Sequence, residues 1–131
     1  MTSYRRGMHP FRAAVEAHDM DAALALLAED VVFRSPVVFA PYRGRDAVAP
    51  ILRAVARVFG DFRYVREIGS PDGADHVLVF RARVGNRELE GSDFLHTGDR
   101  GLIDELTVMV RPLSAALALA EAMKAQLAGS A

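Results

Sequence analysis

Asp93 is the residue whose type and surroundings point most directly to chemistry. It lies in the segment Ser92-Asp93-Phe94-Leu95, within the part of the chain after Phe62 that turn signals divide into strands. A carboxyl group among apolar side chains favours its neutral form, so its pKa rises and it can donate a hydrogen bond or a proton near neutral pH. Whether Asp93 has such surroundings depends on how the neighbouring strands pair.

The pairing of the strand before Asp93 is predicted by a turn signal and by charge. Gly85-Asn86 has the composition of a two-residue hairpin loop. Such a loop places Arg83 opposite Glu88 and Arg81 opposite Glu90. These two opposite-charge pairs favour this register, because a one-residue slip would destroy both of them.

The pairing of the strand after Asp93 is predicted from a four-residue loop over residues 98–101. This loop places Thr97 opposite Leu102 and Asp93 opposite Leu106. The expected neighbours of the carboxyl group are then all apolar: Leu78, Phe80, Leu95, Leu106 and Val108. An alternative is that Asp93 only accepts a hydrogen bond from a backbone amide near a bend in the sheet.

Two helices and a strand are predicted before the sheet. Apolar residues at helical spacing indicate a first helix over residues 9–18. Asp19 is placed to cap a second helix that runs to residues 29–30. The β-branched run over residues 31–35 then predicts a strand that Pro36 ends.

The rest of the chain predicts a third helix, four strands and a last helix. Asp46 is the expected cap of the third helix, with Pro50 in its first turn, where backbone N–H groups lack partners. Turn signals from Phe62 onward separate four strands, and an Ala/Leu-rich helix spans about residues 113–128, with Leu113 and Leu117 on its apolar stripe. We therefore expect one α+β domain over residues 1–131, in which a curved antiparallel sheet wraps around the N-terminal helices.

Composition excludes several classes of function. Apolar residues make up 51% of the chain, which favours extra buried surface in a pocket or an interface. The net charge of -1, with no Lys/Arg block, argues against nucleic acid as a partner. The chain has no Cys, its His residues lack metal-ligand spacing, and no nucleotide-binding motif occurs, so no metal or cofactor is expected. No stretch has the length of a membrane span, and we expect a cytoplasmic protein without a membrane partner.

Four segments carry a family resemblance: Val15 to Pro36, Gly44-Arg45-Asp46-Ala47, Ser92-Asp93-Phe94-Leu95, and Arg100-Gly101-Leu102-Ile103. In order and spacing they resemble the nuclear transport factor 2-like superfamily, which includes ketosteroid isomerase, scytalone dehydratase, limonene epoxide hydrolase and SnoaL-like polyketide cyclases, together with members that only bind or scaffold. The resemblance implies the cystatin-like cone of that superfamily, here with an additional C-terminal helix and an apolar pocket inside.

The resemblance to ketosteroid isomerase suggests further candidate site residues and argues against the activity of that enzyme. The resemblance places its oxyanion-hole aspartic acid on Asp93, its general base on Ser35 and its oxyanion-hole tyrosine on Phe11. A serine hydroxyl does not abstract a proton next to a carbonyl, and a phenyl ring donates no hydrogen bond, so ketosteroid isomerisation is not expected. A neutral Asp93, with Ser35, is expected to hold the carbonyl or hydroxyl group of a hydrophobic ligand.

Two functions remain open at this point. The first is a protein that binds a small apolar molecule; if it is catalytic, isomerisation, dehydration or hydrolysis of a hydrophobic carbonyl or hydroxyl compound is expected, with Asp93 as the acid. Tyr42 and Tyr64 are candidate hydroxyl donors inside the cone, although packing at its rim accounts for both equally well. The expected pocket wall comprises Phe11, Val15, Phe33, Tyr42, Phe80, Leu89, Leu106, Val108 and Val110.

The second function is a non-catalytic dimeric scaffold or protein-interaction module. It rests on the apolar residues expected on the outer face of the sheet, which suit a homodimer. These are Val77, Val79, Phe94, Ile103, Thr107 and Met109. The C-terminal helix is expected either to cover the open end of the cone or to contact a second subunit.

Overall fold

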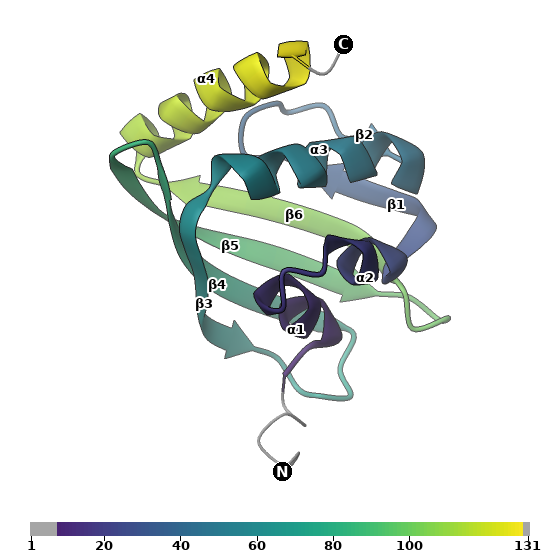
Figure 1. The fold of residues 1–131 in the computed structure, drawn as a ribbon. Coiled ribbons are helices and arrows are strands. Elements are labelled where there is room, and N and C mark those ends of the chain that lie inside the picture. The colour runs from purple at the N-terminus through teal and green to yellow at the C-terminus, as the bar shows by residue number, and fades with distance from the viewer. Residues whose placement is uncertain (1–7, 130–131) are drawn as a thin grey trace.

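The computed structural model describes residues 8–129, so the ends of the expected domain, residues 1–7 and 130–131, lie outside the described range. The described chain contains four helices and six strands, drawn in Figure 1. In chain order they are α1 (Pro10–Glu16), α2 (Met20–Ala25), β1 (Leu27–Arg34), β2 (Tyr42–Arg43), α3 (Arg45–Val58), β3 (Gly60–Ile68), β4 (Asp75–Val84), β5 (Arg87–Thr97), β6 (Ile103–Arg111) and α4 (Leu113–Gly129).

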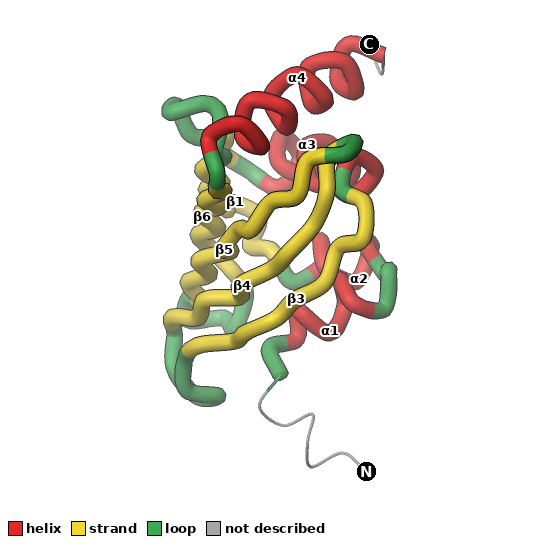
Figure 2. Tube along the Cα trace, turned by 90° about the vertical axis from the view of Figure 1, so that its left-hand side faces the viewer, coloured by secondary structure: helices red, strands yellow, loops and turns green. Residues whose placement is uncertain are grey.

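The strands form one curved sheet with the order β2-β1-β6-β5-β4-β3. All neighbours are antiparallel except β1 and β6, which run parallel. Figure 2 shows the sheet bending around α1, α2 and α3, while α4 crosses one end. This arrangement confirms the expected α+β cone with its additional C-terminal helix. No helix within residues 8–129 is long and apolar enough to cross a membrane.

The two N-terminal helices are short and capped by side chains. The Nδ1 atom of His9 accepts the backbone N–H of Phe11, and an oxygen of Asp19 accepts that of Ala22. The second helix was predicted to reach residues 29–30, but it ends at Ala25. Leu27 instead begins β1, where it is fully buried and pairs with β6. Tertiary burial in the sheet therefore overrides the helical pattern of this stretch.

The third helix begins one residue before the predicted cap. Gly44 is the N-cap, with φ of 93°, and its N–H donates to the carbonyl of Val31. A positive φ of this size favours glycine, which explains the shift of the boundary. Asp46 consequently lies in the first turn, and Pro50 lies in the second turn and not the first as predicted. The helix buries Val48 and neighbouring apolar residues against the inner face of the sheet.

The predicted register of β4 and β5 is confirmed. Arg83 pairs with Glu88, Arg81 pairs with Glu90, and Asp93 lies opposite Leu78. The Arg81 and Glu90 side chains form an ion pair of 3.6 Å across the ladder. The charge pattern therefore identified the correct register.

The predicted register of β5 and β6 is wrong by two residues. Thr97 pairs with Ile103, and Asp93 lies opposite Val108 instead of Leu106. The loop between the two strands is one residue longer than predicted, and a bulge at Asp104 adds the second residue of the shift. A shift of two keeps Asp93 on its predicted face. The bulge also turns Ile103, expected on the outer face, into the core, where it is 2% exposed.

The last helix packs only part of its surface. Ala115 and Leu119 are buried against the core, whereas Leu113 and Leu117, placed by prediction on the apolar stripe, are 74% and 60% exposed. The helix is apolar on all sides, so periodicity alone does not identify its buried face.

Candidate active site

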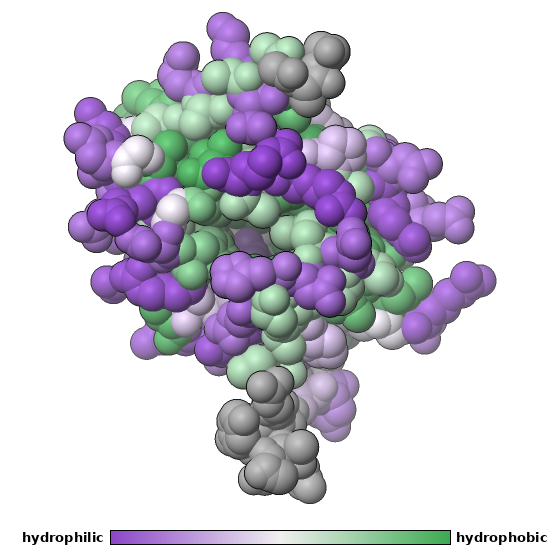
Figure 3. Space-filling view, viewed as in Figure 1, coloured by the Kyte–Doolittle hydropathy of each residue, from purple (hydrophilic) through white to green (hydrophobic). Residues whose placement is uncertain are grey.

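The concave side of the sheet encloses a cavity of about 700 Å³. Figure 3 shows the surface hollowed between α3 and the pair α1 and α2, so the cavity opens on this face. Most of its wall is apolar, and the sheet, α1, α3, α4 and the loop after β1 all contribute to it. A volume of this size falls in the range of small-molecule sites.

Asp93 and Tyr64 form a hydrogen-bonded pair in the cavity wall. The Tyr64 hydroxyl donates to Oδ2 of Asp93 over 2.8 Å. Each residue is only 7% exposed, and both border the cavity. Oδ1 of Asp93 has no hydrogen-bond partner among the described residues. One carboxyl oxygen is therefore held by the protein and the other is available to a ligand.

Burial controls the ionisation of this pair. It raises the pKa of Asp93 from 3.8 to about 7, and the hydrogen bond from Tyr64 limits the rise because it stabilises the carboxylate. The pKa of Tyr64 is raised well above 10, first by burial and then by the neighbouring Asp93. Tyr64 thus stays a neutral donor, while Asp93 changes between acid and carboxylate near neutral pH.

An aromatic cluster forms the wall beside the pair. The Phe62 ring stacks on Phe80 at 4.9 Å between centroids and meets Tyr64 edge-on at the same distance. Phe80 lies over Gly91 of the next strand, where an added Cβ atom would come within 2.2 Å of the Phe80 ring. The lack of a side chain at Gly91 therefore gives Phe80 its place in the wall.

Most of the expected wall residues border the cavity. Those that do are Phe11, Val15, Phe33, Tyr42, Phe80, Leu106 and Val108. Leu89 and Val110 do not border it, which corrects the prediction. Leu89 is a buried core residue that pairs with Ala82, and the shifted register places Val110 opposite Gly91, beyond the polar pair.

Ser35 lies in the cavity wall, but its hydroxyl serves the backbone. Its oxygen accepts the N–H groups of Val37 and Val38 at 3.2 and 2.9 Å, and the hydroxyl is 3.4 Å from the carbonyl of Val38. These contacts shape the loop after β1. The structure does not bring Ser35 into hydrogen-bond contact with Asp93, its expected companion in the site.

Tyr64 is the site residue that the sequence interpretation missed. From the sequence alone, packing at the rim accounts for Tyr64 equally well. In the structure Tyr64 lies opposite Phe80, on the same face as Asp93. The alternation of Phe62 and Tyr64 was an available signal, since both share one face of a strand.

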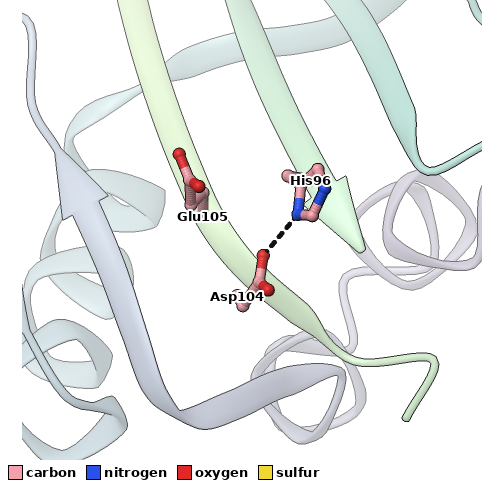
Figure 4. A group of neighbouring side chains, drawn as sticks. All are labelled: His96, Asp104 and Glu105. Carbon is pink, nitrogen blue, oxygen red and sulfur yellow. Dashed lines mark hydrogen bonds and ion pairs between the residues drawn. The ribbon is translucent and has the colours of Figure 1, made fainter. Parts of the chain in front are cut away.

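A second polar group lies on the outer face of the sheet. His96, Asp104 and Glu105 have potential metal-ligand atoms within 4.8 Å of one another. Figure 4 shows His96 and Asp104 turned toward each other, with 2.7 Å between Nδ1 and the carboxylate oxygen. Glu105 forms an ion pair with Arg34. These partners account for the group without a ligand.

Comparisons with known proteins agree with the fold. The chain is similar to a steroid delta-isomerase from Pseudomonas aeruginosa, with 44% identity, a TM-score of 0.85, and coverage of 90% of this chain and 86% of that one. It is also similar to an uncharacterised protein with a cystatin-like fold from Silicibacter pomeroyi DSS-3, at 38% identity and a TM-score of 0.85, over 94% and 89% of the two chains.

More distant structures share the fold alone. An NTF2-like protein from Cytophaga hutchinsonii is 21% identical, with a TM-score of 0.58 over 79% of this chain and 85% of that one. No curated protein matches the chain. Residues 9–110 match the SnoaL-like domain family. The chain therefore belongs to the SnoaL-like family, within the nuclear transport factor 2-like superfamily.

Proposed function

We propose that the protein binds a small hydrophobic molecule in its cavity and holds one carbonyl or hydroxyl oxygen of that molecule at Asp93. The observation that carries this proposal is the Tyr64–Asp93 hydrogen bond of 2.8 Å at the wall of an apolar cavity. A buried polar pair in a mostly apolar wall fixes the orientation of a ligand, because an unpaired buried polar group is costly.

The ionisation of Asp93 suits acid catalysis as well as binding. With a pKa of about 7, a large fraction of Asp93 is protonated at neutral pH. The proton on the free oxygen can bond to a ligand oxygen or pass to it. Such a transfer leaves a carboxylate that the Tyr64 hydroxyl already stabilises. We therefore place any activity among acid-assisted isomerisations, dehydrations or hydrolyses.

Ketosteroid isomerisation stays outside this proposal despite the name of the Pseudomonas relative. Phe11 has no hydroxyl group to donate, and the Ser35 hydroxyl is engaged by the loop that follows it. The polar pair of this chain instead comes from β3 and β5. Any reaction in this cavity is thus expected to use Asp93 as its acid.

Two matched probes test the proposal: 2-naphthol and naphthalene, which differ by one hydroxyl group. We expect the wild-type protein to bind 2-naphthol about tenfold more tightly, since a well-formed hydrogen bond to such a group is worth on the order of 1.4 kcal/mol. In Asp93→Leu the preference should disappear, while naphthalene binding persists. Equal affinity of the wild type for both probes would refute a polar contact at Asp93.

A non-catalytic dimeric module is the second candidate. Phe94 and Met109 are 39% and 59% exposed on the outer face of the sheet, on adjoining strands. An apolar face of this kind fits a homodimer. Analytical ultracentrifugation should show a dimer that Met109→Glu dissociates, whereas the control Leu117→Glu, on exposed α4, leaves it intact. A wild-type monomer at high concentration would end this proposal.

A further inference from the structure

A bulge in β3 turns two polar side chains to the inner face of the sheet. Tyr64 lies opposite Phe80 and Glu67 lies opposite Leu78, both of which are buried on that face. Residues three apart in a regular strand face opposite sides. The register shift between Tyr64 and Arg66 supplies the extra residue that turns both side chains inward. They therefore share the side of the sheet on which α1 lies (Figure 1).

Arg12 of α1 occupies the space between these side chains. Its guanidinium carbon lies 6.0 Å from the centroid of the Tyr64 ring, within the range of a cation–π contact. Its Nε donates to Glu16 over 3.1 Å, and its Nη1 donates to Glu67 over 3.3 Å. The second oxygen of Glu67 accepts the backbone N–H of His9. The arginine is consequently fixed by two carboxylates while it contacts the tyrosine.

We propose that Arg12 is a positioning residue that acts through Tyr64 on Asp93. A cation near the aromatic ring attracts its π electrons and fixes the ring in place, and both effects strengthen the phenol as a hydrogen-bond donor. A stronger donor stabilises the Asp93 carboxylate and so favours release of its proton. The inference rests on the proposed function, since it explains how the polar end of the cavity is tuned.

Glu16 acts on the same tyrosine in the opposite sense. The groups that face Tyr64 are Arg12 and Glu16 of α1 and Asp93 of β5, while Glu67 on its own strand holds the arginine. After burial and the contributions of Asp93, the negative charge of Glu16 raises the pKa of Tyr64 and the positive charge of Arg12 lowers it. Removal of the Arg12 charge should therefore raise the pKa of Asp93, and removal of the Glu16 charge should lower it.

The experiment follows the Asp93 carboxyl carbon by NMR across pH and needs no ligand. We expect Arg12→Met, which keeps an apolar stem, to raise the titration midpoint by roughly half a pH unit, and Glu16→Gln to lower it by a similar amount. Arg12→Lys, which retains the charge, should restore at least half of the shift. If Arg12 and Glu16 had only a structural role, the two substitutions would not shift the Asp93 midpoint in opposite directions.

A Tyr64→Phe background shows whether the effect passes through the phenol. In that background Arg12→Met should change the Asp93 titration midpoint by less than about 0.2 pH units. A change this small is distinct from the half-unit shift expected when the Tyr64 hydroxyl is present. An equal shift with and without the Tyr64 hydroxyl would overturn the proposal, as would an unchanged midpoint in folded Arg12→Met and Glu16→Gln. Because no ligand is used, these outcomes are independent of whether 2-naphthol binds.

Discussion

Asp93 and Asp104 are carboxylates of the neighbouring strands β5 and β6 that face opposite sides of the same sheet. Asp93 is buried, its partner is a neutral phenol, and its pKa rises to about 7. Asp104 is 38% exposed at its side chain, and its partner is the imidazole of His96, whose pKa it raises. Burial therefore dominates on the inner face, and local pairing dominates on the outer face.

The difference shows which ionisable group lowers the stability of the fold. A buried acid with a raised pKa destabilises the fold once it is charged, because the unfolded chain ionises more easily than the native state. A partly exposed pair is solvated and contributes little to stability. Such a cost is typical of a group retained for function, which is the reading we give to Asp93.

Replacement of Asp93 should have the largest effect. The folded pKa of about 7 exceeds the unfolded value of 3.8, so wild-type stability falls as pH rises from about 4 to 7 and then levels off. This difference is worth roughly 4 kcal/mol at pH 8. Asp93→Asn should therefore be clearly more stable than the wild type at pH 8 and close to it at pH 4, as measured by denaturant unfolding. Parallel pH profiles of the two proteins would contradict the raised pKa.

The burial of Asp93 was predictable, whereas its pairing with Tyr64 was not. Two charge pairs and a two-residue loop determine the β4–β5 register, and this register places Asp93 on the inner face. The β3 bulge that turns Glu67 to the same face as Tyr64 is not fixed by a turn or a charge pair, although the adjacent apolar residues Tyr64 and Val65 interrupt the alternation there. Long-range packing selects such a bulge, and pattern analysis of one strand does not reveal it.

The outer-face cluster was missed for a related reason. Regular alternation would have placed Asp104 inside and Ile103 outside, and the bulge in β6 reverses both. The cavity wall was predicted better than the register, because a slip of two residues keeps each side chain on its face. The predicted wall residues that do not border the cavity are those farthest along the strands, Leu89 and Val110.

Added volume should destabilise the protein more at Gly91 of β5, against the aromatic cluster, than at Gly60 of β3. At Gly91 an added methyl group meets the Phe80 ring, so Gly91→Ala should destabilise the protein by about 1–3 kcal/mol and alter the cavity wall. Gly60→Ala in β3 is the matched control, since its added Cβ lies 3.8 Å from the nearest atom. Equal unfolding midpoints of the two variants would show that Phe80 moves aside freely.

The smallest effect is expected on the outer face. Because Asp104 raises the pKa of His96, the pair stabilises the folded state below the ordinary pKa of histidine, and the contribution is lost as pH rises through the raised value. Asp104→Asn should lower the His96 midpoint seen by NMR, and added salt should lower it in the wild type, since exposed charges are screened. Asp93 should not respond to salt in this way. A salt-independent His96 midpoint would mean that the outer pair is as shielded as the inner one, and the contrast between the two faces would fail.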